Sequence, residues 1–199
     1  AGKEGTYNIP GATIVADGNN YTSNSVDIKV LPPDQSASST GRGNASANQA
    51  GGQISNKDLF ITATASKTDV YEQEAILLTY KIYTKVNLTQ LHGDMPDLKG
   101  FHTQEVELPS QKQWTMEHYN GSNYNTTVYS QYVLFPQQSG KLEIPSITFD
   151  GTISQMVASA DPFDAFFNGG SYVIVNKKIV TPKVMINVKE LPAGKPANF

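Results

Sequence analysis

Hydrophobic and polar residues alternate along much of this chain, which is the pattern of β-strands with one buried face. The first examples are Thr6–Val15 and Tyr21–Leu31, which lie on either side of Asp17-Gly18. An Asp-Gly pair readily adopts the positive φ angles of a tight turn, and Pro10 interrupts the first segment. These segments are therefore predicted to form a β-hairpin, which on its own is at best marginally stable in water.

A longer series of strands follows the hairpin. Within Glu72–Tyr83, alternation puts Ile76, Leu78, Tyr80 and Ile82 on one face, and this face is predicted to point into a core. The other strands predicted in this region are Leu59–Ala65, Phe101–Leu108, Trp114–Tyr119, Tyr124–Phe135 and Lys183–Lys189.

The strand Tyr124–Phe135 carries aromatic residues at positions of both parities. Because side chains alternate between the two faces of a strand, strict alternation divides these residues into two sets. The prediction is that Tyr124, Val128, Tyr132 and Leu134 face the core, and that Tyr129, Val133 and Phe135 lie on the opposite face.

Composition changes sharply after the hairpin. Residues 33–56 are dominated by Ser, Ala, Gly and Asn, which is typical of a flexible linker between two bodies. The expected organisation is the C-terminal strands of a truncated domain at 1–32, the linker at 33–56, a whole domain at 57–192 with an insertion at 153–181, and the start of a linker to a further domain at 193–199.

A motif near the start of the chain recurs late in it. "GTYNIPGATI", beginning at Gly5, is similar to "GKLEIPSITF", beginning at Gly140, and "VDIKVLPP" is similar to "VMINVKELP". Repetition over a domain length indicates tandem domains rather than a solenoid. The predicted fold is therefore all-β: an immunoglobulin-like β-sandwich in tandem repeat, with a truncated N-terminal copy.

Composition supports this fold class and excludes several functions. Ten Tyr, eight Phe, 16 Gly and 11 Pro favour short strands joined by turns. The net charge of −3, with 15 basic and 18 acidic residues, provides no basic field for nucleic acid. The absence of cysteine excludes disulfides, thiolate metal sites and cysteine nucleophiles. No apolar run approaches the roughly 20 residues of a membrane span.

The insertion contains the segment "DPFDAFFNGGSY" at residues 161–172. Its Asp-Pro start is suited to capping a helical turn, on which Phe163, Phe166 and Phe167 would share one face. These three residues and Tyr172 either plug the sandwich or contact a partner protein, and both interpretations remain open. They are the candidate partner-binding residues.

Signals for catalysis are weak. The spacing of the histidines fits no compact metal-ligand signature, and no serine lies in a GxSxG elbow. We therefore expect no enzyme activity, no catalytic residue and no cofactor. The three histidines are His92, His102 and His118.

Two ligand-binding alternatives remain. The turn Gly93–Asp97 supplies Asp94 and Asp97, which are weak candidates for a calcium site, although aspartates in turns often bond only to their own backbone. An aromatic platform for carbohydrate is the second alternative, since amphipathic rings suit sugar faces and protein interfaces alike. Its candidate residues are Trp114, Tyr119, Tyr124, Tyr129 and Tyr132.

Four stretches together resemble the Bat family D protein (BatD), an aerotolerance protein of bacterial envelopes. They are "VYEQEAILLTYKIYT" from Val70, "YVLFPQQSGKLEIPSITF" from Tyr132, "DPFDAFFNGGSY" from Asp161 and "LPAGKPANF" from Leu191.

The resemblance implies a non-enzymatic protein–protein interaction module of a membrane-anchored complex, exposed in the periplasm and linked to oxygen tolerance. The implied partners are sister Bat proteins with von Willebrand A domains and, indirectly, an ATPase of the MoxR class. The signal peptide and anchor of such a protein are absent from this sequence, so we expect a fragment. A homodimer through the truncated N-terminal hairpin is a further expectation.

Overall fold

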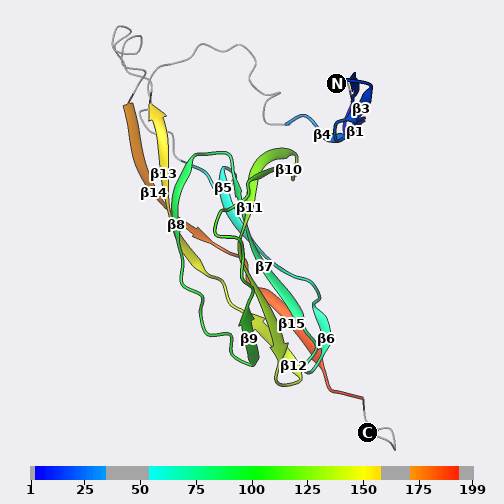
Figure 1. Cartoon of the computed structure of the whole chain (residues 1–199). Coiled ribbons are helices and arrows are strands. Elements are labelled where there is room, and N and C mark those ends of the chain that lie inside the picture. Colours follow the sequence, from blue (N-terminus) through cyan, green and yellow to red (C-terminus); the bar gives the residue numbers. More distant parts are fainter. Residues whose placement is uncertain (1–2, 35–53, 158–170, 193–199) are drawn as a thin grey trace, which may run out of the picture. The chain divides into compact units, whose positions relative to one another are not determined.

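The structure is a computed structural model that describes residues 3–34, 54–157 and 171–192 (Figure 1). These residues form strands, turns and extended segments, and no helix lies among them, which confirms the all-β prediction. The chain divides into two compact units. One contains residues 1–44 and 116–124, and the other contains residues 45–115 and 125–199.

The N-terminal segments form the predicted hairpin. Its turn is made by Asp17 and Gly18, whose φ angles of 50° and 74° suit a type I′ turn. The ladder breaks in the middle, after Pro10, because proline has no N–H to donate. Four short strands result: β1 (Gly5–Ile9) pairs with β4 (Val26–Val30), and β2 (Thr13–Ala16) pairs with β3 (Asn19–Thr22).

The larger unit is a β-sandwich. One layer is formed by β11, β7 and β5 in that order, with β9 also paired to β11; β10, most of whose residues belong to the first unit, pairs with β11 in the same sheet. Its strands are β5 (Leu59–Ala65), β7 (Ile76–Thr84), β9 (Phe101–Glu105), β10 (Thr115–Tyr119) and β11 (Ser122–Pro136).

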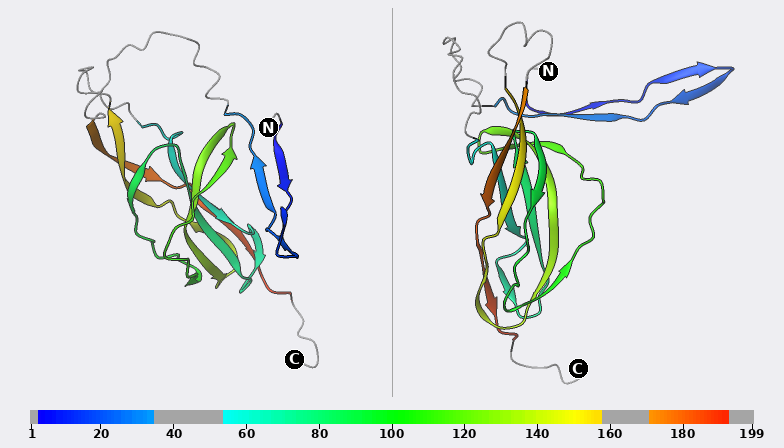
Figure 2. Two further views of the ribbon diagram at one scale, coloured as in Figure 1. Left: turned by 45° about the horizontal axis from the view of Figure 1, so that its top comes forward. Right: turned by 90° about the vertical axis from the view of Figure 1, so that its left-hand side faces the viewer.

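The opposing layer consists of two three-stranded sheets, β12-β15-β6 and β14-β13-β8. In the right-hand view of Figure 2, β14 and β15 run along one side of this unit. The strands are β6 (Asp69–Tyr71), β8 (Leu88–His92), β12 (Gly140–Ile144), β13 (Thr148–Val157), β14 (Ser171–Val180) and β15 (Val184–Lys189).

The core lies between these layers. The predicted inward face of β7 is confirmed, because Ile76, Leu78, Tyr80 and Ile82 are all buried. They join one hydrophobic cluster with side chains of β5, β12, β13, β14 and β15. Burial of each large apolar side chain stabilises the fold by roughly 1.5–3 kcal/mol. Ile54 belongs to the same cluster, so packing begins within the segment 33–56 that the sequence suggested is a linker.

A β-bulge in β11 overturns part of the parity prediction. The register with β7 shifts between Val128 and Ser130, so that Tyr129 is an extra residue. After the bulge, Tyr132 pairs with core-facing Leu78, as predicted. Before it, Val128 pairs with Lys81 on the outer face, and Tyr124 has the same parity as Val128. The predicted core orientation was therefore wrong for Val128, whereas Tyr124 is buried at 6% exposure. Tyr129, predicted on the opposite face, packs against the core cluster.

The two similar sequence motifs adopt the same hydrogen-bonding pattern. Gly5 pairs with Val30 and Gly140 with Val188, each at the start of a five-residue ladder. At the end of the first ladder, the backbone N–H of Ala12 donates to Ser23 Oγ and the N–H of Ser23 to the Ala12 carbonyl, both at 2.9 Å. Ile147 and Thr181 make the same two bonds at the same distances. The tandem repeat and the immunoglobulin-like strand order themselves remain predictions.

Candidate functional site

The predicted insertion is in large part a long β-ribbon. β13 and β14 pair antiparallel over ten consecutive residues each, from Thr148↔Val180 to Val157↔Ser171. β8 pairs with β13 only between Asp150 and Ile153, so the far end of the ribbon is two-stranded. Figure 1 shows this end extending past β8. The sequence signal that was missed is the β-branched run "YVIV" in β14.

The two-stranded end of the ribbon exposes large apolar side chains. Tyr172, Val173 and Ile174 are 65%, 41% and 61% exposed. Neighbouring residues of a strand point to opposite faces, so apolar groups reach solvent on both faces of the ribbon. We call these three residues the ribbon patch. The other candidates, Phe163, Phe166 and Phe167, and the predicted helical turn lie outside the described residues.

The loop that contains the calcium candidates Asp94 and Asp97 packs against the hydrophobic core. Gly93 begins it, and a Cβ atom at this position would lie 2.2 Å from the ring of buried Phe149. The loop can therefore press against the core only with glycine there. Asp94 is 93% exposed and lies 3.7 Å from His92 Nε2, while Asp97 is also exposed.

Across residues 3–34, 54–157 and 171–192, no three His, Asp or Glu side chains gather as metal ligands. Two other aspartates of the larger unit, Asp58 and Asp69, have local partners. Asp58 accepts hydrogen bonds from the backbone N–H and the hydroxyl of Ser55, and Asp69 accepts one from the Asn187 amide. The other two histidines contact residues of nearby strands. The ring of His102 lies near that of Phe135, and His118 Nδ1 lies 2.8 Å from Asn123 Oδ1.

Most of the proposed aromatic platform lies in the protein interior. Tyr129 packs edge-on against Phe149 with ring centroids 5.1 Å apart, and Tyr132 packs edge-on against Tyr80 at 6.4 Å. Tyr124 is buried as well. Burial, with a smaller contribution from Tyr132, raises the pKa of Tyr80 to about 12. These rings are structural, and of the five candidates only Trp114 and Tyr119 are exposed.

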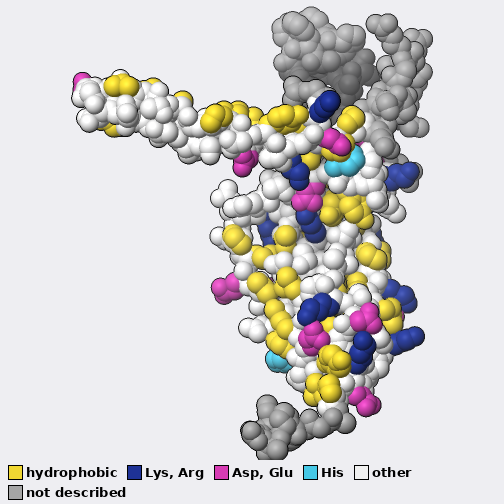
Figure 3. All heavy atoms as spheres, turned by 90° about the vertical axis from the view of Figure 1, so that its right-hand side faces the viewer, with side chains coloured by type: hydrophobic (Ala, Val, Ile, Leu, Met, Phe, Trp, Pro, Cys, Tyr) yellow, Lys and Arg dark blue, Asp and Glu magenta, His cyan; other side chains and the backbone are white. Residues whose placement is uncertain are grey.

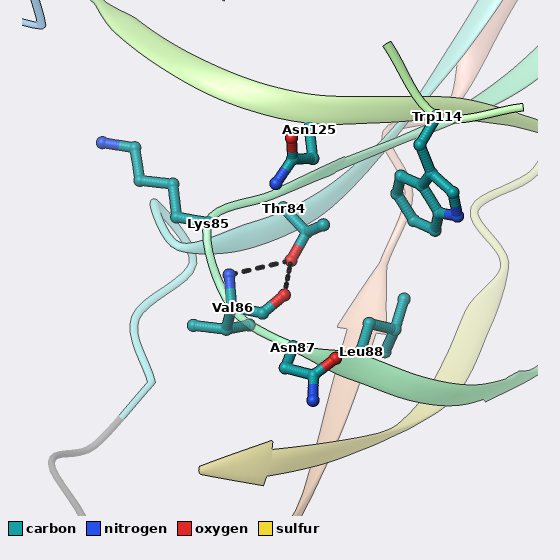
Figure 4. Close-up of a pocket in the computed structure, with 7 residues that line it drawn as sticks. All are labelled: Thr84, Lys85, Val86, Asn87, Leu88, Trp114 and Asn125. Atoms are coloured by element: carbon teal, nitrogen blue, oxygen red, sulfur yellow. Dashed lines mark hydrogen bonds between the residues drawn. The ribbon is translucent and has the colours of Figure 1, made fainter. Parts of the chain in front are cut away.

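Trp114 lines a cavity of about 490 Å³ in the larger unit. Figure 4 shows its indole beside Leu88 and Thr84, with Asn87 and Asn125 bordering the same space. Sequence reasoning selected Trp114 as an aromatic residue but missed the cavity. The reason is that its walls come from three separate segments, namely residues 84–88, 114 and 125.

No helix of the described segments is long and apolar enough to cross a membrane. No curated protein matches this chain. A family model does match it: the model described as "BatD DUF11 like domain" covers residues 63–162, which is half of the 199-residue chain. The match contains the two stretches that begin at Val70 and Tyr132 and that carried the sequence resemblance. The chain therefore belongs to the BatD family.

Proposed function

We propose that this chain is a non-enzymatic docking module that binds other envelope proteins through the ribbon patch. The observation that carries this proposal is the exposure of Tyr172, Val173 and Ile174 at the two-stranded end of β13–β14. Large apolar groups exposed together favour burial against another protein, because each contributes roughly 1.5–3 kcal/mol when it leaves water.

The backbone of the ribbon adds a second means of docking. Among the described residues, β14 is the last strand in the order β14-β13-β8, so at the ribbon patch its outer edge presents N–H and C=O groups. An extended segment of a partner can pair with such an edge, while its side chains contact the apolar groups on either face. Strand addition of this kind supplies affinity through main-chain hydrogen bonds and specificity through side chains.

Membership of the family supports the choice of partner. We propose that the module works in the periplasm, as part of a membrane-anchored protein linked to oxygen tolerance. The proposed partners are the sister Bat proteins with von Willebrand A domains, with a MoxR-class ATPase acting indirectly. The chain contains no cysteine, and its proposed contribution to oxygen tolerance is assembly rather than direct thiol chemistry.

Binding to purified von Willebrand A domain Bat proteins, measured by biolayer interferometry, tests the docking proposal. Ile174→Asp or Tyr172→Asp is expected to weaken binding at least about tenfold, because a charge would have to be buried at the interface. Asn176→Asp is the matched control, since Asn176 is an exposed residue further along the same strand. Equal binding by all three variants would contradict the proposal, and so would a wild-type protein that binds none of these partners.

The N-terminal hairpin supports a second, independent contact. We propose that residues 1–32 are the final strands of a second sandwich and therefore require a cover. Tyr7 and Ile28 pair across this hairpin and are 44% and 46% exposed, whereas the corresponding pair in the larger unit, Leu142 and Ile186, is 7% and 0% exposed. Figure 3 shows hydrophobic side chains along the hairpin. A homodimer through this face is one way to cover it.

A further inference from the structure

The cavity beside Trp114 has the size and the mixed polar and apolar lining of a small-molecule binding site. Its volume of about 490 Å³ is within the range of roughly 300–1,000 Å³ that ligand pockets have in proteins. Its lining combines one indole, two carboxamides, a lysine and the aliphatic side chains of Val86 and Leu88 (Figure 4).

The floor of the cavity is held in place before any ligand arrives. The hydroxyl of buried Thr84 donates to the Val86 carbonyl at 2.8 Å and accepts from the Val86 N–H at 3.1 Å. Lys85 donates its backbone N–H to the Asp58 carbonyl, and the Asn87 carbonyl accepts from Ser154. The loop between β7 and β8 is therefore fixed at both ends, which lowers the entropic cost of binding.

The opposite wall is anchored to β11. Thr115 directly follows Trp114, and its hydroxyl lies 3.2 Å from that of Thr126, which is fully buried. Thr126 also donates to the Thr115 carbonyl at 3.3 Å. These contacts hold the backbone at Trp114 beside β11, while the indole itself stays 47% exposed. Its ring is thus available to a ligand without rearrangement of the sheet.

We propose that this cavity binds one or two pyranose units of a saccharide. An exposed indole offers a flat apolar surface to the C–H face of a sugar ring. The carboxamides of Asn87 and Asn125 each carry donors and an acceptor, which suits hydroxyl groups that are themselves both donors and acceptors. None of the described residues that line the cavity carries a carboxylate, so a cation is a poor fit, and a neutral polyol with one apolar face matches this lining best.

The chain provides its own probe for this test, because Trp114 is its single tryptophan. Titration of the whole chain with glucose, galactose, mannose, N-acetylglucosamine and cellobiose is followed by tryptophan fluorescence and by ¹H–¹⁵N chemical shifts. At least one sugar is expected to shift the emission and the side-chain amide signals of Asn87 and Asn125. The expected Kd is about 0.1–10 mM, as befits an open site.

Variants separate stacking from hydrogen bonding, with chemical shifts as the common measurement. Trp114→Ala is expected to weaken binding at least about tenfold, Trp114→Phe about threefold, and Asn125→Ala about three- to tenfold. Tyr71→Ala is the control, since it removes another exposed aromatic ring of the same unit and should leave the Kd unchanged. Well-dispersed core methyl signals in each variant verify that the sandwich is intact.

Three results would overturn the proposal. One is the absence of any shift with all five sugars up to about 50 mM. Another is binding by Trp114→Ala that equals that of the wild type. The third is a loss in Tyr71→Ala as large as the loss in Trp114→Ala, which would indicate non-specific contact with aromatic rings. None of these results bears on the ribbon patch, which is tested with protein partners.

Discussion

At the scale of single residues, Tyr80 is the most informative polar group. Its ring is completely buried, and no described residue makes a hydrogen bond with its hydroxyl. A buried hydroxyl without a partner costs free energy that the folded state must offset. Tyr80→Phe is therefore expected to leave the free energy of unfolding unchanged or to raise it by up to about 1 kcal/mol, as measured by urea unfolding monitored through Trp114 fluorescence.

The same residue predicts how stability depends on alkaline pH. Because the pKa of Tyr80 is about 12 in the folded protein and about 10 when unfolded, the folded state retains the proton more strongly. Its contribution to stability is complete below about pH 10 and is lost as pH rises toward 12, by up to about 1.4 kcal/mol per pH unit. Tyr80→Phe should reduce this slope. An unchanged slope would mean that Tyr129 and Tyr132, whose pKa values are also raised by burial, carry the effect.

Much of the residue-level packing was predictable, and the exceptions have a physical cause. The inward set of β7 followed from period-two alternation over a regular strand. Alternation failed in β11 because one extra residue, Tyr129, bulges to reach Phe149. A bulge is stabilised by contacts with a distant strand, so the local pattern of hydrophobic residues does not reveal it.

At the scale of elements, the ladders β1–β4 and β12–β15 allow the same hydrogen bond to be compared in an exposed and in a buried setting. Thr181 is 1% exposed and its hydroxyl accepts from the Ile147 N–H, whereas Ser23 makes the equivalent bond in an exposed setting. Thr181→Val is expected to lower the free energy of unfolding by about 1–3 kcal/mol, because a buried N–H loses its acceptor. Ser23→Ala should change it by less than about 0.5 kcal/mol, because water replaces the hydroxyl.

Urea unfolding followed by Trp114 fluorescence measures Thr181→Val, because both residues lie in the larger unit. Ser23 lies in the other unit, so Ser23→Ala is measured by the urea dependence of the backbone amide signals of residues 3–34. Backbone amide chemical shifts of residues 3–34 report whether the hairpin keeps its register in Ser23→Ala. Equal losses in the two variants would show that exposure does not govern the strength of this bond, contrary to the expectation.

The elements themselves were predicted unevenly. The turns at Asp17-Gly18 and Asn120-Gly121 follow from side chains and glycines that tolerate positive φ, and both positions have it. Residues 153–181 were interpreted as an insertion, and their pairing as the ribbon of β13 and β14 was not predicted. These two strands are separated by residues 158–170 in the sequence. Non-local pairing of this kind leaves only a weak trace in either strand alone.

At the scale of the whole molecule, the two units should differ in local stability. Every described side chain of β1, β2 and β3 is exposed, whereas β5 and β7 contribute to a buried cluster. In the 199-residue chain at a concentration where it is monomeric, amides of β1–β4 are expected to exchange at least about 100-fold faster than those of β5 and β7, measured by hydrogen exchange with NMR or mass spectrometry.

Slow exchange in both units would contradict this prediction and would imply that the hairpin is covered. Sedimentation analysis at several concentrations then identifies a second copy as the cover. Ile28→Asp supplies the control, because a charge on the apolar face should restore fast exchange and abolish any dimer.

Fold class and family were accessible from sequence because both depend on the chain-wide pattern of strands and turns. The candidate site was less accessible. The sequence shows Trp114 as a single aromatic residue. Its proposed role in binding a sugar also requires Asn87 and Asn125, which the strand topology brings to the same cavity. The division into domains remains a prediction, and the exposure of apolar residues in the hairpin is the observation that motivates it.

The pairing of β15 with β6 also determines how the larger unit responds to mechanical force. These strands are parallel, with Asn187, Val188 and Lys189 opposite Asp69, Val70 and Tyr71. Strand β6 lies early in the unit and β15 at its end, so tension applied along the chain pulls the two strands past one another. All of their hydrogen bonds then bear the load together in shear, instead of opening one at a time. This arrangement makes the sandwich a stiff link in any assembly that is stretched.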